Sequence, residues 1–178
     1  NISKPEIVDI LNAKYLAISP ASIADKNFNG FYSLRLKDTS KLPVLFQNIL
    51  KKRDHKIIYF GKAETQTLAK RLYQELYAKG HGTFYRSIGA VLGYLPENGS
   101  LKDKANQNNY KFSASNNLKI IKWIEENLEI AIFKFSGDFK VEKATIEHYT
   151  PLLNDCHNPL SLTELKQLKD QCRKTARN

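Results

Sequence analysis

The stretch that decides the fold covers residues 56–71 and reads Lys-Ile-Ile-Tyr-Phe-Gly-Lys-Ala-Glu-Thr-Gln-Thr-Leu-Ala-Lys-Arg. Its beginning is rich in β-branched and aromatic residues and is closed by a glycine, a pattern that predicts a strand. Thr65 or Thr67 can cap a helix that runs to Lys79 and stops at Gly80. Leucines recur every four residues along this helix and define its buried face, at Leu68, Leu72 and Leu76.

Two further strands are predicted, at residues 30–37 and 129–135, with helical patterns between and after them. This order predicts an α+β fold, in which a small three-stranded antiparallel sheet is flanked by helices. We divide the chain into an N-terminal helical extension at residues 1–27, a central domain at residues 28–155 with an insert at 38–55, and a basic C-terminal helix at residues 156–178 packed on that domain.

The helices are predicted from apolar residues at helical spacing. In the N-terminal extension, a short helical pattern from Ile7 to Leu11 ends near Pro20. The residues Ser-Leu-Thr-Glu at 161–164 have the form of a capping box for the C-terminal helix. Residues 95–113 are polar and predict an exposed loop, either a plain linker or a DNA-facing segment. The other helices are expected within the insert and at residues 84–92, 116–128 and 138–150.

The charge balance indicates a polyanionic partner. The formal net charge is +10, which favours nucleic acid or an anionic membrane surface, although a merely soluble basic surface would give the same surplus. No apolar run approaches the roughly 18 residues that a membrane-spanning helix needs, so we expect no membrane partner. There is no zinc, P-loop or dinucleotide-binding pattern, so we expect no nucleotide cofactor. The two cysteines predict reduced thiols in a cytoplasmic protein.

Three motifs follow one another along the chain: Gly-Phe-Tyr at residues 30–32, Tyr-Phe-Gly-Lys-Ala at residues 59–63, and Glu142 ahead of Pro-Leu-Leu-Asn at residues 151–154. In this order they resemble the GIY-YIG nuclease domain over residues 28–155. The resemblance implies hydrolysis of phosphodiester bonds in DNA, with RNA left open, and a divalent metal ion, Mg²⁺ or Mn²⁺. Mg²⁺ often binds through only one or two carboxylates plus phosphate oxygens, so a single carboxylate suffices for such a site.

Glu142 is the candidate metal ligand. On a helix, Glu142 falls on an apolar face with Phe139 and Ile146, whereas Glu147 falls on the opposite face. A carboxylate on an apolar face is costly unless it is paired or bound to a metal ion. The alternative is a carboxylate at the helix edge that pairs with a lysine. Asn154 follows Glu142 by 12 residues, and the resemblance implies that it orients Glu142 or the substrate.

Four further catalytic candidates follow from the resemblance. Tyr32 and Tyr59 match the two family tyrosines on adjacent strands, although either could be an ordinary packed tyrosine of the sheet. An unperturbed tyrosine has a pKa of about 10, so a tyrosine that acts as a base needs a nearby cation. Lys62 and Arg71 supply such charges and could also hold a phosphate. Four residues after Arg71 the family often has His or Tyr; here Glu75 stands off the leucine face, which predicts a solvated carboxylate.

Nucleic-acid binding is predicted for basic side chains near the second helix of the domain and on the C-terminal helix. These are His81, Arg86, Lys166, Lys169, Arg173 and Lys174. The sequence thus predicts a metal-dependent endonuclease. The alternatives are a nucleic-acid-binding module of the same fold that does not cleave and, less well supported, a basic scaffold for an acidic protein. Oligomeric state and target sequence are left open.

Overall fold

Three seven-residue strands form the sheet of the computed structural model, which describes residues 4–178. They are β2 (Gly30–Leu36), β3 (Ile57–Ala63) and β4 (Leu128–Lys134), and all their pairings are antiparallel. A two-residue strand, β1 (Leu16–Ala17), pairs with β4 and extends the order to β1-β4-β2-β3. The predicted α+β class is confirmed, with four strands in place of three. β2 lies at the centre, and β3 is an edge strand.

The N-terminal extension differs from the expected helix. The structure has no helix around Ile7 to Leu11, and α1 (Pro20–Ala24) begins where the pattern was expected to end. Ile10 is instead fully buried, and Val8 donates its backbone N–H to the Thr145 hydroxyl at 3.0 Å. Packing of single apolar residues, rather than a helical face, therefore anchors this segment. Residues 1–3 lie outside the described part of the chain.

The helices agree with the predicted pattern in type and, within a few residues, in bounds. The insert contains the short 3-10 helix η1 (Thr39–Lys41) and α2 (Val44–Leu50), and the Thr67 hydroxyl caps the N-terminus of α3. The capping box expected at residues 161–164 does not form, because Leu162 is the N-cap residue. The remaining helices are α3 (Leu68–Tyr77), α4 (Thr83–Val91), α5 (Ala114–Asn127), α6 (Val141–Tyr149) and α7 (Thr163–Arg177).

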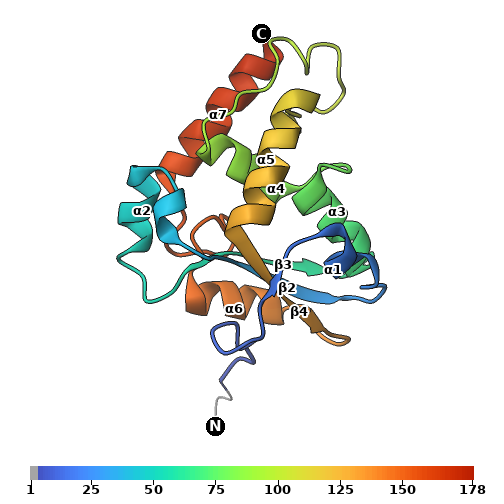
Figure 1. The fold of residues 1–178 in the computed structure, drawn as a ribbon, viewed down its shortest axis with the longest axis vertical. Coiled ribbons are helices and arrows are strands. Elements are labelled where there is room, and N and C mark those ends of the chain that lie inside the picture. The colour runs from blue at the N-terminus through green and yellow to red at the C-terminus, as the bar shows by residue number, and fades with distance from the viewer. Residues whose placement is uncertain (1–3) are drawn as a thin grey trace.

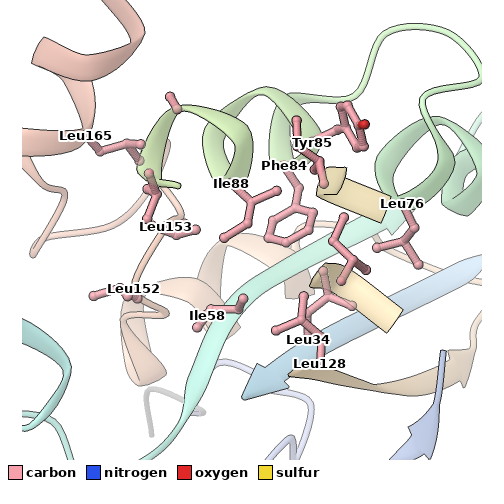
Figure 2. Close-up of a cluster of buried hydrophobic side chains, with 14 of the residues drawn as sticks. Leu34, Ile58, Leu76, Phe84, Tyr85, Ile88, Leu128, Leu152, Leu153 and Leu165 are labelled. Atoms are coloured by element: carbon pink, nitrogen blue, oxygen red, sulfur yellow. The ribbon is translucent and has the colours of Figure 1, made fainter. Parts of the chain in front are cut away.

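The sheet separates two hydrophobic clusters. Helices α3, α4 and α5 lie on one side of it and α6 on the other (Figure 1). Figure 2 shows the larger cluster, in which Phe84 and Ile88 of α4 pack between Ile58 and Leu34 of the sheet and Leu165 near the start of α7. The smaller cluster joins the opposite face of the sheet to α6, through Phe31, Ile57, Phe60, Phe139, Val141 and Ile146.

A β-bulge in β3 alters the direction of its side chains. Leu34 pairs with Tyr59 but the next residue, Arg35, pairs with Ile57, so Ile58 is the extra residue. Ile58 and Tyr59 consequently both pack against the larger cluster. Bulges commonly re-aim a side chain beside an active site. Here regular alternation places Tyr59 on the same face of the sheet as Tyr32, and the bulge turns Ile58 onto that face beside it.

The segment after α6 covers part of the free edge of β3. Leu152 and Leu153 donate backbone N–H groups to the carbonyls of Ile57 and Ile58, at 3.2 and 2.8 Å. Asn154 then bonds both backbone groups of Phe60 through its side chain. No described residue continues this cover beyond Phe60, so the end of β3 stays open at the edge of the sheet. Within residues 4–178, no helix has the length and apolar character needed to span a membrane.

Candidate active site

An open cleft of about 330 Å³ lies beside the uncovered end of β3. Strand β3 supplies Tyr59 and Lys62 to its walls, α3 supplies Arg71 and α6 supplies Glu142, and Tyr32 of β2 also lines it. Helices α3 and α6 pack on opposite faces of the sheet, yet both reach the edge strand. The structure therefore brings five of the six predicted catalytic side chains into one cleft.

Aromatic packing holds the Tyr59 ring in place. Its ring lies 5.3 Å from that of Phe84 and 6.2 Å from that of Tyr32, measured between centroids. Burial raises the pKa of Tyr59 far above its usual value, and the negative charge of Glu75 adds to the effect, whereas the positive charge of Arg71 opposes it. Tyr59 therefore keeps its proton at neutral pH, and its hydroxyl has no hydrogen-bond partner among the described residues.

Tyr32 has a different environment from Tyr59. It is fully buried, and its hydroxyl donates a 2.9 Å hydrogen bond to Glu75 Oε2. Its ring passes over Gly61, the residue that pairs with it on β3, where any Cβ would overlap the phenol. The glycine of the second motif is thus required by this close approach.

Glu75 is not the solvated carboxylate expected from the leucine face, because it is completely buried. Glu75 follows Leu68 by seven residues, so it lies at the edge of the buried leucine face, between Tyr32 of β2 and the beginning of α4. Glu75 Oε2 also accepts the backbone N–H of Phe84 at 3.2 Å, and Oε1 lies 3.4 Å from Arg71 Nη2. Burial raises the pKa of Glu75, and Arg71 acts most strongly against that shift.

Glu142 is the half-buried carboxylate of the cleft, with 17% of its side chain exposed against 49% for Glu147. The predicted difference between the two faces of α6 is confirmed. Its nearest cation is Lys62, with Nζ 3.9 Å from Oε1, while Lys62 forms a closer 3.0 Å pair with Glu64. Burial raises the pKa of Glu142, and Lys62, His157 and Arg71 oppose the shift.

The donor set fits a hard divalent cation bound by few protein ligands. Within residues 4–178, no group of three or more His, Cys, Asp or Glu side chains is placed to hold a metal ion. The cleft also contains Glu64, which is exposed and paired with Lys62, so Glu142 is its more buried carboxylate. Mg²⁺ is commonly held by one or two carboxylates, with water and substrate phosphate completing its shell. Glu142 is the residue that would hold such an ion.

Asn154 lies next to the cleft rather than in it. Its Oδ1 accepts the Phe60 N–H at 2.8 Å, and its Nδ2 donates to the Phe60 carbonyl at 2.9 Å. Both ends of the amide are therefore used by β3, and no hydrogen bond joins Asn154 to Glu142. The side chain fixes the segment after α6 against β3, which is a positioning role.

A second hollow of about 280 Å³ continues the cleft and shares Tyr59 and Glu142 with it. Its other walls include the predicted Lys169 of α7 and two residues that sequence reasoning missed, Cys156 and His157. His157 has a backbone φ of 65°, a left-handed conformation that is uncommon outside glycine. The available signal was the position of His157 three residues after Asn154, in a turn-rich segment.

The basic residues predicted to bind nucleic acid divide into two groups. Lys169 and Arg86 are half-buried, and neither forms an ion pair with a described residue. Lys169 lines the second hollow, whereas Arg86 lines a separate hollow of about 60 Å³ with Tyr110 and Lys111, although its charge still acts on Tyr59. Burial lowers the pKa of Lys169, as do the charges of Arg86 and Arg173. Lys166 pairs with Asp155, which lines the second hollow, at 3.5 Å.

The second group lies apart from the cleft. His81 lines a separate hollow of about 350 Å³, formed with Lys104 and Lys111 of the loop between α4 and α5. Lys174 is exposed near the end of α7 and forms no ion pair within the described chain. These residues extend the basic surface beyond the cleft but do not line the site.

Comparisons with known proteins agree with the geometry. A family model described as a GIY-YIG catalytic domain matches residues 30–175, a range that includes all the cleft residues and most of α7. No curated protein and no solved structure matches the chain.

Proposed function

The chain belongs to the GIY-YIG catalytic domain family, a family of nucleases, and from that membership we propose that it is a divalent-metal-dependent endonuclease that hydrolyses phosphodiester bonds in DNA. One observation carries the proposal. Glu142 is a half-buried carboxylate that faces the same cleft as Tyr59 and Arg71, and among the described residues it has no partner closer than Lys62 at 3.9 Å. A buried carboxylate with only a long ion pair is costly for a purely structural helix, and binding of a cation would offset that cost.

The residues of the cleft can divide the reaction between them. The metal ion held by Glu142 would act as a Lewis acid on the scissile phosphate. Arg71 would bind a non-bridging phosphate oxygen, because its guanidinium is charged at all relevant pH values. Tyr59, protonated at neutral pH, would orient the attacking water by hydrogen bonding rather than accept its proton in the resting state. Lys62, whose ammonium group lies 3.9 Å from the Glu142 carboxylate, would neutralise negative charge of the bound substrate.

Nucleic acid would enter along the two joined hollows. Lys169 lines the second hollow and Arg86 acts on Tyr59 from α4, and within the described chain neither cation has an acidic partner. The predicted Arg173 lies near Lys169 but is paired with Asp170. Charges left unpaired and partly desolvated favour an anionic ligand more strongly than solvated surface lysines do. They would hold backbone phosphates, which gives affinity and register without reading sequence.

The test is plasmid cleavage by wild type and two isosteric variants of the same helix. Glu142→Gln removes the proposed ligand, and Glu147→Gln is the matched control, because Glu147 is exposed and paired only with Lys143. Supercoiled plasmid is incubated at low salt with Mg²⁺ or Mn²⁺. We expect nicking by wild type and Glu147→Gln and none by Glu142→Gln. Equal cleavage by all three proteins would refute the assigned site.

The alternative function, a binding module that does not cleave, has one observation in its favour. Arg71 already lies 3.4 Å from the buried Glu75, so part of its charge is neutralised within the protein. Salt-dependent DNA binding by wild type and both variants, with no cleavage of the plasmid or of a library of random sequence, would support this alternative.

A further inference from the structure

The side chain at position 75 is the feature of the site that the proposed function leaves without a role. Glu75 is completely buried between α3 and α4, and it contacts three elements around the cleft. Its Oε2 accepts hydrogen bonds from the Tyr32 hydroxyl on β2 and from the Phe84 N–H at the beginning of α4. Its Oε1 accepts no hydrogen bond from the described part of the chain and faces the Arg71 guanidinium on its own helix.

We infer that Glu75 is a positioning residue that holds the Arg71 guanidinium at the cleft and binds the Tyr32 hydroxyl as a donor, so that Tyr59 is the tyrosine that contacts the attacking water. This inference rests on the proposed function for its catalytic meaning. Its geometric content, the placement of Arg71 and Tyr32, stands on the contacts alone.

The two tyrosines differ in what their hydroxyls can still do. The Tyr32 hydroxyl donates its proton in a hydrogen bond to the Glu75 carboxylate, and Tyr32 is 0% exposed. Its oxygen is therefore unavailable to a water molecule in the cleft. Tyr59 is partly exposed and its hydroxyl makes no hydrogen bond to the described chain. The resemblance implies that both tyrosines belong to the site, whereas the hydrogen bond to Glu75 gives Tyr32 a role different from that of Tyr59.

Arg71 needs an anchor because a flexible cation binds a phosphate less well than a preoriented one. Its Nη1 donates to Gln74 Oε1 at 3.2 Å, while Nη2 faces Glu75. The contact to Glu75 is an ion pair without a hydrogen bond, so a substrate phosphate can compete for the same guanidinium. A glycine at position 82 leaves the necessary space, since a Cβ there would lie 2.6 Å from Glu75 Oε1.

The anchor depends on the charge of Glu75 and therefore on pH. The ionisable groups that face it are Tyr32 of β2, Tyr59 of β3, Arg71 of α3, Arg86 of α4 and Lys169 of α7. Burial raises the pKa of Glu75, and the hydrogen bond from Tyr32 lowers it. As pH falls through this raised pKa, the carboxyl becomes neutral and Arg71 is released. Removing the Tyr32 hydroxyl should move that release to higher pH.

The direct measurement is the Arg71 side-chain NMR signal across pH, identified by its loss in Arg71→Lys. In wild type we expect it to titrate. In Tyr32→Phe the midpoint should lie at higher pH, and in Glu75→Gln the signal should be independent of pH and resemble the low-pH form of wild type. Glu126→Gln, an exposed helix position, should behave as wild type. An Arg71 signal that is the same in Glu75→Gln and wild type at every pH would overturn the inference.

Cleavage kinetics then test the catalytic part. Loss of the anchor should lower kcat by roughly ten- to a hundredfold, as expected for misplacement of a catalytic group by up to about 1 Å. Tyr59→Phe should lose more activity than Tyr32→Phe, and the reverse order would overturn the assignment of the tyrosines. If wild type cleaves no substrate, the proposed function fails, while the Arg71 signal still decides whether Glu75 positions the guanidinium.

Discussion

Replacing Asn154 by Ala should destabilise the fold, although its side chain lies beside the cleft rather than in it. The change leaves two buried backbone groups of Phe60, an N–H and a C=O, without partners. Each such group costs about 1–3 kcal/mol when left unsatisfied, and water entering from the open edge would reduce the total, so we expect a loss of about 2–4 kcal/mol. At about 2–4 °C per kcal/mol for a chain of this size, the melting temperature should fall by roughly 5–15 °C.

The assay is thermal unfolding by circular dichroism, with hydrogen exchange of the Phe60 amide as the local readout. Asn154→Asp keeps an acceptor for the Phe60 N–H and loses the donor to its carbonyl, so Phe60 should stay better protected than in Asn154→Ala. Asn48→Ala, at an exposed position in α2, is the matched control. A melting temperature of Asn154→Ala equal to that of Asn48→Ala, with unchanged exchange at Phe60, would show that the amide does not hold the segment on β3.

Three further outcomes are expected. Burial raises the pKa of Glu142, so this carboxylate ionises at a higher pH than an ordinary Glu. Metal-dependent cleavage should therefore rise as pH increases through that pKa, and a higher Mg²⁺ concentration should move the midpoint to lower pH. A pH–rate series at two Mg²⁺ concentrations measures both effects. Lys169→Gln should lower the slope of log affinity against log salt by about one phosphate contact, measured by fluorescence anisotropy beside the exposed control Lys41→Gln; an unchanged slope would place the DNA elsewhere. Cys156 is exposed and lines the second hollow, whereas Cys172 is buried, so maleimide should label Cys156. Duplex DNA should slow this labelling, and equal rates with and without DNA would contradict the proposed path.

Patterns of single elements predicted most of the fold. The leucine spacing of α3 and the apolar face of α6 predict sides of these helices that are buried in the structure, and periodicity alone distinguishes Glu142 from Glu147. Such patterns are local, because a helix with one buried face repeats its burial every three to four residues.

What sequence reasoning missed came from contacts between elements. Glu75 follows Leu68 by seven residues and so lies at the edge of the leucine face of α3, where it contacts both Tyr32 of the sheet and the beginning of α4. His157 joins the site because the chain turns back beside β3, which no periodicity encodes. The N-terminal pattern failed for the opposite reason, since residues 7–11 are apolar at helical spacing but are too few to form a stable helix alone.

The partly covered edge of β3 also bears on how molecules of this protein behave toward one another. A free strand edge offers backbone groups to any other strand, and natural proteins deter such intermolecular β-pairing with charged side chains, lysine above all. The open end of β3 carries Lys62, followed by the exposed Glu64. Lys62 therefore also disfavours pairing of this edge with a second molecule, so a substitution that removes its charge should lower solubility as well as activity.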